Sequence, residues 1–179
     1  MQPKHLGRHL RGFVLPLMLL ASAQPALADD PITIAAKIPY ASDDVARDAV
    51  REQCDWNSEL PATLVAKSGG MLVSTDQNLA TVQGRKLVIT ATEVHGMAGH
   101  GFAGPSWIAV HGELSADGKV LGKFDFRRST VHGRMTVCGT LSYIGRALSG
   151  NILNWLKNPT MNAAPGNSSE SSDAGSAAP

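Results

Sequence analysis

The first half of the chain alternates apolar, β-branched runs with segments of helical spacing. Residues 32–38 (ITIAAKI) predict a strand. The acids and apolar positions of residues 42–57 predict a helix, and Pro61 suits the first turn of a second helix. Two glycines at residues 69–70 end that helix, and residues 71–74 form a short apolar strand. This order predicts two parallel strands joined by a right-handed crossover.

The second half has the patterns of antiparallel strands. Residues 86–94 are strand-like, and residues 107–114 and 120–128 flank Asp117-Gly118. Asp-Gly between two apolar runs is a strong signal for a two-residue hairpin turn. We therefore expect three strands here, the last two joined by this turn.

The hairpin turn also predicts which face of these two strands is buried. If the residues that flank the turn pair with each other, Lys123 and Asp125 point to one face. The opposite, core-facing set is then Trp107, Ala109, His111, Phe124, Phe126 and Arg128. His111 is therefore expected beside Phe124, as a hydrogen-bonded core histidine.

The end of the chain divides into a helix and a tail. Residues 140–157 carry apolar side chains at steps of three and four, as an amphipathic helix does. Residues 160–179 have almost no apolar bulk and predict a disordered tail. Residues 29–159 are then expected to form a single α+β domain, with a mixed, mostly antiparallel sheet and the helices packed on one face.

The first 28 residues have the pattern of a secretory signal peptide. Three basic residues precede a short apolar run over residues 12–20, and Ala26-Leu27-Ala28 supplies small residues for cleavage after Ala28. The apolar run is too short for a permanent membrane span, and nothing later in the sequence resembles one. We expect a soluble protein exported to the periplasm.

Charge excludes one class of partner. The chain has 16 basic and 15 acidic residues, and the signal peptide carries three of the basic ones, so the mature chain has 13 against 15. Nucleic-acid binding needs clustered Lys and Arg, which this sequence does not supply. No nucleic-acid partner is therefore expected.

Cys54 and Cys138 are the only cysteines. In an oxidising compartment, two thiols in one small domain usually form a disulfide. Here the bond would close a loop of more than eighty residues and stabilise the fold by about 4 kcal/mol, because it restricts the unfolded chain. A reactive thiol pair or two metal ligands are the alternatives, but redox cysteines normally lie a few residues apart.

The densest cluster of candidate ligands lies in the glycine-rich residues 95–105. His95, Met97 and His100 offer two imidazoles and a thioether, donors that together suit copper, or zinc through imidazole alone. The alternative is a long turn with solvated histidines, and no CxxC or HExxH motif accompanies the cluster. We therefore expect no cofactor, with copper or zinc as the alternative.

Basic residues gather only on the last strand of the hairpin, at Lys123, Arg127 and Arg128. They could meet an acidic partner, or they could be a charged edge that discourages aggregation. The exposed hairpin edge is a natural surface for an envelope protein that adds a strand.

Catalytic motifs are lacking. Ser106 is not in a Gly-x-Ser-x-Gly elbow, and the glycines do not form a Walker loop. His132 or Glu93 could serve as acid or base, but no spacing demands it. We expect no enzymatic activity; an envelope hydrolase is the third hypothesis.

Several segments together resemble a family of small uncharacterised exported proteins of proteobacteria. They are CDWNSELP at 54–61, GHGFAGPS at 99–106, VHGEL at 110–114, DGK at 117–119, RRS at 127–129, Cys138 and WLKNP at 155–159. The resemblance covers residues 32–159. It implies paired cysteines at Cys54 and Cys138, and no known activity, cofactor or catalytic residue. It also implies small residues at positions 95 and 100 in relatives, so a metal site would not be a family trait.

The predicted order of elements is also loosely similar to small α/β modules such as the amino-terminal domain of the TolB translocation protein, an analogy that carries no function. We expect a non-catalytic periplasmic binding or protein-interaction module, for which a role in the cell envelope is one hypothesis. The copper- or zinc-binding protein is the alternative.

Overall fold

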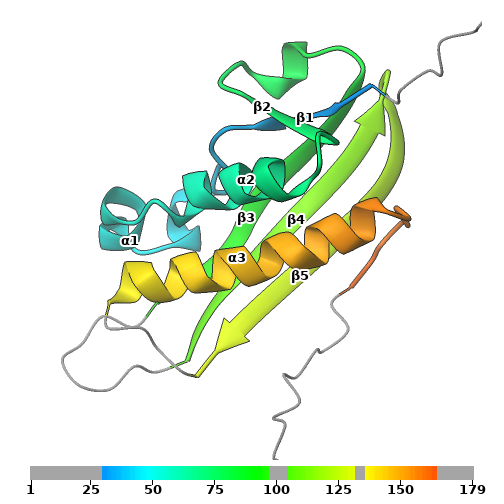
Figure 1. Cartoon of the computed structure of the whole chain (residues 1–179). Helices are drawn as coiled ribbons and strands as arrows, with labels where there is room; N and C mark the ends of the chain where they lie inside the picture. The colour runs from blue at the N-terminus through cyan, green and yellow to red at the C-terminus, as the bar shows by residue number, and fades with distance from the viewer. Residues whose placement is uncertain (1–29, 97–104, 132–135, 165–179) are drawn as a thin grey trace, which may run out of the picture.

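A five-stranded mixed sheet with helices on one face forms the centre of the protein (Figure 1). The computed structural model describes residues 30–96, 105–131 and 136–164. The strands lie in the order β2-β1-β3-β4-β5. In chain order the elements are β1 (Ile32–Ala35), η1 (Asp43–Val45), α1 (Asp48–Gln53), α2 (Trp56–Lys67), β2 (Leu72–Thr75), η2 (Leu79–Thr81), β3 (Arg85–His95), β4 (Ser106–Ala116), β5 (Lys119–Thr130) and α3 (Val137–Leu156). The predicted α+β fold is confirmed.

Parallel and antiparallel pairing meet at β3. Strand β1 pairs in parallel with β2 and with β3, whereas β3, β4 and β5 form an antiparallel meander. Asp117 and Gly118 both have positive φ, and Ala116 pairs with Lys119 across them. Positive φ at both central residues is what a type I′ hairpin turn requires. The predicted parallel pair and the predicted turn are both confirmed.

Helices α2 and α3 cover one face of the sheet, and the core lies between the two layers (Figure 1). The apolar stripe predicted for the last helix is buried along its whole length: Leu141, Ile144, Leu148, Ile152, Trp155 and Leu156. Full burial of one such side chain contributes about 1.5–3 kcal/mol. Among the described residues, no helix is long and apolar enough to cross a bilayer.

The helix predicted over residues 42–57 is instead two short helices, so this prediction is wrong. Ala46 and Arg47 adopt extended backbone between η1 and α1, and Ala46 is buried. Arg51 of α1 forms ion pairs with Asp43 and with Asp48. The break between η1 and α1 lets the side chain of Ala46 pack in the core, and the ion pairs of Arg51 connect the two helices.

Helix α2 contains a proline in its interior. Pro61 is the sixth residue of α2, not a first-turn residue as predicted, because the helix begins at Trp56. A proline cannot donate to the carbonyl four residues earlier, which here belongs to Asn57. That carbonyl accepts a hydrogen bond from Ile38 N at 2.9 Å, and Asn57 Nδ2 donates to Ile38 O at 3.1 Å. The segment after β1 therefore satisfies the group that Pro61 leaves unpaired.

A bulge in β5 changes the register of the hairpin. Leu121 has no partner on β4, because the register shifts between Leu114 and Ser115. One extra residue moves every later pair by one position and exchanges the two faces of the strand. His111 therefore pairs with Asp125, and not with Phe124 as predicted.

The core face predicted for β4 is consequently wrong. Trp107, Ala109 and His111 lie on the face of the sheet opposite to α2 and α3, which is called the helix-free face. The buried side chains of β4 alternate with them and face the helices: Ile108, Val110 and Leu114. Phe124 and Phe126 of β5 are buried, as predicted.

A disulfide joins Cys54 to Cys138, with Cα atoms 5.0 Å apart and 84 residues between them in sequence. It links the junction of α1 and α2 to the first turn of α3. The predicted bridge is confirmed. The predicted signal peptide lies outside the described residues.

Residues 160–163 pair with the outer edge of β5. Lys123 N donates to Thr160 O at 3.1 Å, and Ala163 N donates to Lys123 O at 3.0 Å. The prediction of disorder from residue 160 onward is therefore wrong for these residues, because backbone pairing does not need apolar side chains. Residues 165–179 lie outside the described part.

Candidate functional site

Polar side chains pair between strands across the helix-free face of the sheet. Lys123 on β5 forms an ion pair with Glu113 on the neighbouring β4 at 2.7 Å, and Arg127 on β5 reaches over β4 to Glu93 on β3 at 3.4 Å. His111 Nδ1 and Asp125 Oδ1, on β4 and β5, lie 2.8 Å apart and form a hydrogen bond. Each partner is at least one-third exposed, so each pair contributes about 1 kcal/mol or less. Cross-strand pairs of this kind stabilise a solvated sheet face.

Trp107 stands between two side chains of the neighbouring strands. The ring of His95 stacks on it with centroids 4.0 Å apart and planes 9° apart, and the Arg127 guanidinium carbon lies 4.7 Å from its centroid. Stacking and cation–π attraction hold these three groups together. Trp107 is therefore already engaged by groups of the protein itself.

The basic residues predicted as an interaction surface do not share one face. Lys123 and Arg127 lie on the helix-free face, and each is paired with a carboxylate. Arg128 has the opposite parity and pairs in register with Ile108, whose side chain is buried. The structure thus divides this set between the two faces of β5.

Only one of the three predicted metal ligands lies in the described part. His95 ends β3 and stacks on Trp107, whereas Met97 and His100 lie outside the described residues. Among residues 30–96, 105–131 and 136–164, no three His, Cys, Asp or Glu side chains come together to hold a metal. Copper or zinc binding by His95, Met97 and His100 stays a prediction.

Of the two predicted hydrolase residues, Glu93 and His132, only Glu93 lies in the described part. Glu93 forms the ion pair with Arg127, and Ser106 is buried at the start of β4. His132 lies outside the described residues. Envelope hydrolysis through Glu93 or His132 stays a prediction.

The connection from β2 to β3 crosses the sheet on its helix-free side. Because β1 lies between β2 and β3, this connection must pass over β1. A right-handed crossover in this direction uses the face opposite to the helices that joined β1 to β2. Lys86 precedes the buried Leu87 on β3, so its side chain points to the opposite face of the sheet. There it contacts the connection, because its Nζ donates to Leu79 O at 2.9 Å. The short 3-10 helix η2 is therefore held over the face of the sheet opposite to α2 and α3.

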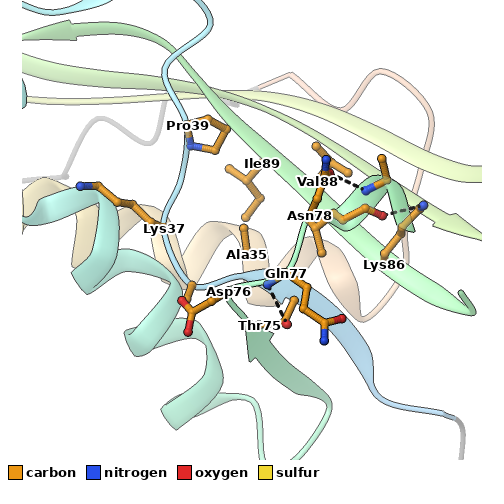
Figure 2. Close-up of a pocket in the computed structure, with 13 residues that line it drawn as sticks. Ala35, Lys37, Pro39, Thr75, Asp76, Gln77, Asn78, Lys86, Val88 and Ile89 are labelled. Carbon is orange, nitrogen blue, oxygen red and sulfur yellow. Dashed lines mark hydrogen bonds between the residues drawn. The ribbon is translucent and has the colours of Figure 1, made fainter. Parts of the chain in front are cut away.

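A pocket of about 590 Å³ lies beneath this crossover, where β1 and β2 end (Figure 2). Its lining is mostly apolar, and it comes from the segment after β1, the segment after β2 and the first part of β3. The lining residues are Ala35, Ala36, Lys37, Pro39, Thr75, Asp76, Gln77, Asn78, Leu79, Ala80, Lys86, Val88 and Ile89. Ligands of open α/β sheets bind at this position, outside the carboxyl ends of parallel strands.

Short-range hydrogen bonds fix the wall that the crossover contributes. Gln77 N donates to Thr75 Oγ1 at 3.1 Å, and Ala80 N donates to Asn78 Oδ1 at 2.9 Å. Asn78 thereby caps η2, as Asn side chains do at the start of helical turns. The pocket wall is thus shaped by the protein itself.

Ionisable side chains lie at the edge of an otherwise apolar pocket. Lys86 Nζ donates to Leu79 O and, at 3.3 Å, to Val82 O, and among the described residues it has no carboxylate partner. Lys37 and Asp76 are exposed, and neither side chain has a partner among the described residues. The pocket therefore combines apolar walls with charged groups that are available to a ligand.

These pocket residues were not among the sequence candidates. The signal for them was the predicted parallel pair of strands at residues 32–38 and 71–74, because the carboxyl ends of such strands meet at one edge of the sheet. The position of Lys86 and Val88 could not be read in the same way, since it depends on the order of strands in space.

Comparisons with known proteins give only distant likenesses. No family model matches the chain, and no curated protein sequence matches it. A solved protein from Xanthomonas campestris, of the DUF330 family model, is 12% identical over 70% of this chain and 82% of its own, with a TM-score of 0.49. The PelC dodecamer of Paraburkholderia phytofirmans is 18% identical over 69% and 89%, with a TM-score of 0.43. A minor lipoprotein of Acinetobacter baumannii is 11% identical over 69% and 91%, with a TM-score of 0.38.

Proposed function

We propose that the protein is a non-catalytic exported binding module that holds a small ligand in the pocket beneath the β2–β3 connection, where β1 and β2 end. The observation that carries the proposal is a preformed, mostly apolar cavity of about 590 Å³ at the carboxyl ends of two parallel strands. Small-molecule sites typically have this size, about 300–1,000 Å³, with apolar walls and a few polar groups. The hydrogen bonds of Thr75 and Asn78 support a wall that exists before the ligand arrives.

The competing surfaces are less suited to recognition. On the helix-free face, Glu93 and Glu113 already have cationic partners in the chain and Asp125 is hydrogen-bonded to His111, so a ligand would have to displace those partners. The edge of β5 at Lys123 is taken by residues 160–163, which reduces the room for a strand from an envelope protein. Binding in the pocket requires neither rearrangement.

A non-catalytic role is supported by the chemistry of the lining. None of the thirteen lining residues is His, Cys or Ser, the groups that most often act as base or nucleophile. Thr75 Oγ1 accepts the hydrogen bond of Gln77 N, a structural use of that hydroxyl. The lining can therefore bind and orient a molecule, and its one hydroxyl, on Thr75, is bonded to the backbone.

An extracytoplasmic location is compatible with the disulfide between Cys54 and Cys138, since such bonds persist in oxidising compartments. The proposal places the protein in the periplasm, because the predicted signal peptide ends at Ala28.

Fluorescence titration with the neutral apolar probe N-phenyl-1-naphthylamine tests the proposal on oxidised protein from residue 29 onward. We expect saturable binding at one site, reduced about tenfold by Val88→Gln, which places an amide in the pocket. Val73→Gln is the matched control, because both valines are about equally exposed, 38% and 40%, and Val73 does not line the pocket. No saturable binding, or equal losses in the two variants, would contradict the proposal.

A further inference from the structure

Resting on the proposed function, we infer that the pocket selects a monomeric amphiphile with an apolar body and one terminal carboxylate. The inference rests on an apolar cavity that is bordered by two lysines, Lys37 and Lys86, and one acid, Asp76.

The body of the ligand follows from the walls. Seven lining residues have only aliphatic side chains: Ala35, Ala36, Pro39, Leu79, Ala80, Val88 and Ile89. Figure 2 draws Pro39, Ile89, Ala35 and Val88 around one hollow. An alkyl chain or an apolar ring gains from leaving water for such a surface, whereas a sugar or a peptide backbone would lose hydrogen bonds there.

The sign of the head group follows from Lys86. Its ammonium group is half-buried and fixed by two carbonyl oxygens, which do not cancel its full positive charge. The carboxylates of Glu93, on the same strand, and of Glu113, on the neighbouring β4, are paired with other cations. Lys86 therefore presents an uncompensated charge at the pocket, and a carboxylate would form a strong, charge-assisted hydrogen bond with it.

The number of charges on the head group follows from the rim. Lys37 adds a second positive charge and Asp76 a negative one, so the lining carries a formal charge of one positive unit. A single carboxylate balances this charge, and a second one would be repelled by Asp76. One terminal anion thus fits better than a dianion or a cation.

A phosphate head group fits less well than a carboxylate. Phosphate sites use glycine-rich turns whose backbone N–H groups converge on the anion. The pocket lining contains no glycine, and the N–H groups of Gln77 and Ala80 are already donated to Thr75 and Asn78. Recognition here depends on lysine side chains.

Displacement of the bound neutral probe by three eight-carbon compounds tests the inference. Octanoate, octanol and octylammonium differ only in the head group and are used below their micelle-forming concentrations. We expect octanoate to displace the probe at about tenfold lower concentration than octanol, with octylammonium weakest. Added salt should weaken the binding of octanoate and leave the binding of octanol unchanged.

Substitutions of the charged residues at the pocket test the preference for a carboxylate head group. Lys86→Met should remove the preference for octanoate over octanol, and the exposed Lys37→Met should reduce it. Asp76→Asn should strengthen octanoate binding alone. Lys67→Met is the matched control, because Lys67 ends α2 and does not line the pocket.

The outcomes distinguish the inference from the function on which it rests. Equal displacement by the three compounds, or an unchanged preference in both Lys37→Met and Lys86→Met, would overturn the carboxylate while leaving a binding pocket. If the neutral probe itself does not bind in a way that depends on Val88, the proposed function fails first.

Discussion

Gly112 faces Phe124 so closely that a Cβ on residue 112 would lie 2.1 Å from Phe124 Cζ. The two residues pair across β4 and β5, and the Phe124 ring occupies the space above the glycine. Phe124 cannot withdraw easily, because it is fully buried and contacts the rings of Phe126 and Trp155 at 4.5 and 4.8 Å between centroids. The ring packing of the core therefore depends on glycine at 112.

Replacing this glycine should overpack the core. We expect Gly112→Ala to lower the free energy of unfolding by about 1–3 kcal/mol, measured by urea denaturation. Gly150→Ala is the control: a Cβ on residue 150 of α3 would have nothing within 4 Å, so alanine should raise stability by up to about 1 kcal/mol. Similar effects of the two substitutions would contradict this account of Phe124.

The bulge at Leu121 gives a second prediction, because Leu121 is the extra residue between the Asp117-Gly118 turn and the pairing of His111 with Asp125. Deleting Leu121 leaves Val120 next to Gly122, so the turn and all pairs of β4 with β5 fit one uninterrupted register. We expect the deletion variant to keep the fold and to unfold cooperatively. Leu121→Ala keeps the residue count and loses only a 38% exposed side chain, so it should cost less than about 1 kcal/mol. Near-ultraviolet circular dichroism and denaturation of both variants would test this.

The same bulge marks the limit of what the sequence could predict for the sheet. The type I′ turn at Asp117-Gly118 is a local signal, and it correctly predicts the pairing next to the turn. A turn sets the register only up to the first irregularity. Gly122 is the available signal, since an isolated glycine inside a strand often accompanies a bulge. Extended without the bulge, the register of the turn pairs His111 with the core residue Phe124, which is why His111 was predicted in the core.

Long-range arrangement explains the other differences between prediction and structure. The stripe of α3 was predictable because helical spacing is a property of one segment. The interior position of Pro61 was not, because it depends on Ile38, a residue on another element that takes over the Asn57 carbonyl. The pocket likewise joins three separate segments, so no single stretch of sequence contains its pattern.

Reducing the disulfide should destabilise the fold. The bond between Cys54 and Cys138 closes a loop of 84 residues, and restricting the unfolded chain in this way contributes about 2–5 kcal/mol. We expect the double variant Cys54→Ser, Cys138→Ser to lose this amount in denaturation under oxidising conditions. Unfolded, unreduced wild-type protein should show no free thiol, and a reactive thiol there would contradict the bond.

Tyr40 should make stability depend on alkaline pH. Burial raises the pKa of the Tyr40 phenol above its ordinary value of 10.0, so the folded state holds the proton more tightly than the unfolded state. The resulting stabilisation is complete below pH 10 and is lost as the pH rises through the folded-state pKa. Tyr40→Phe should flatten the decline in unfolding free energy above pH 10, whereas Tyr143→Phe, which keeps Tyr40, should retain it. Equal slopes in the two variants would contradict this role of Tyr40.

Residues 160–163 should protect the edge of β5 from other chains. Thr160 O accepts hydrogen bonds from Lys123 N and from Trp155 Nε1, which ties the segment both to the strand and to α3. Ending the chain at Pro159 removes these bonds, at a cost of about 1–3 kcal/mol, and opens backbone groups of the edge strand to pairing with a second copy. We expect lower thermal stability and concentration-dependent association in light scattering.

Ending the chain at Ala164 is the control for this truncation. It removes residues 165–179 and keeps the pairing of Ala163 with Lys123, so it should retain the stability and the association state of the full mature chain. If both truncations behave alike, the protection does not come from residues 160–163. If only the shorter chain associates, the segment acts as a built-in edge cover, and the hairpin edge is available to a partner strand only after this segment is displaced.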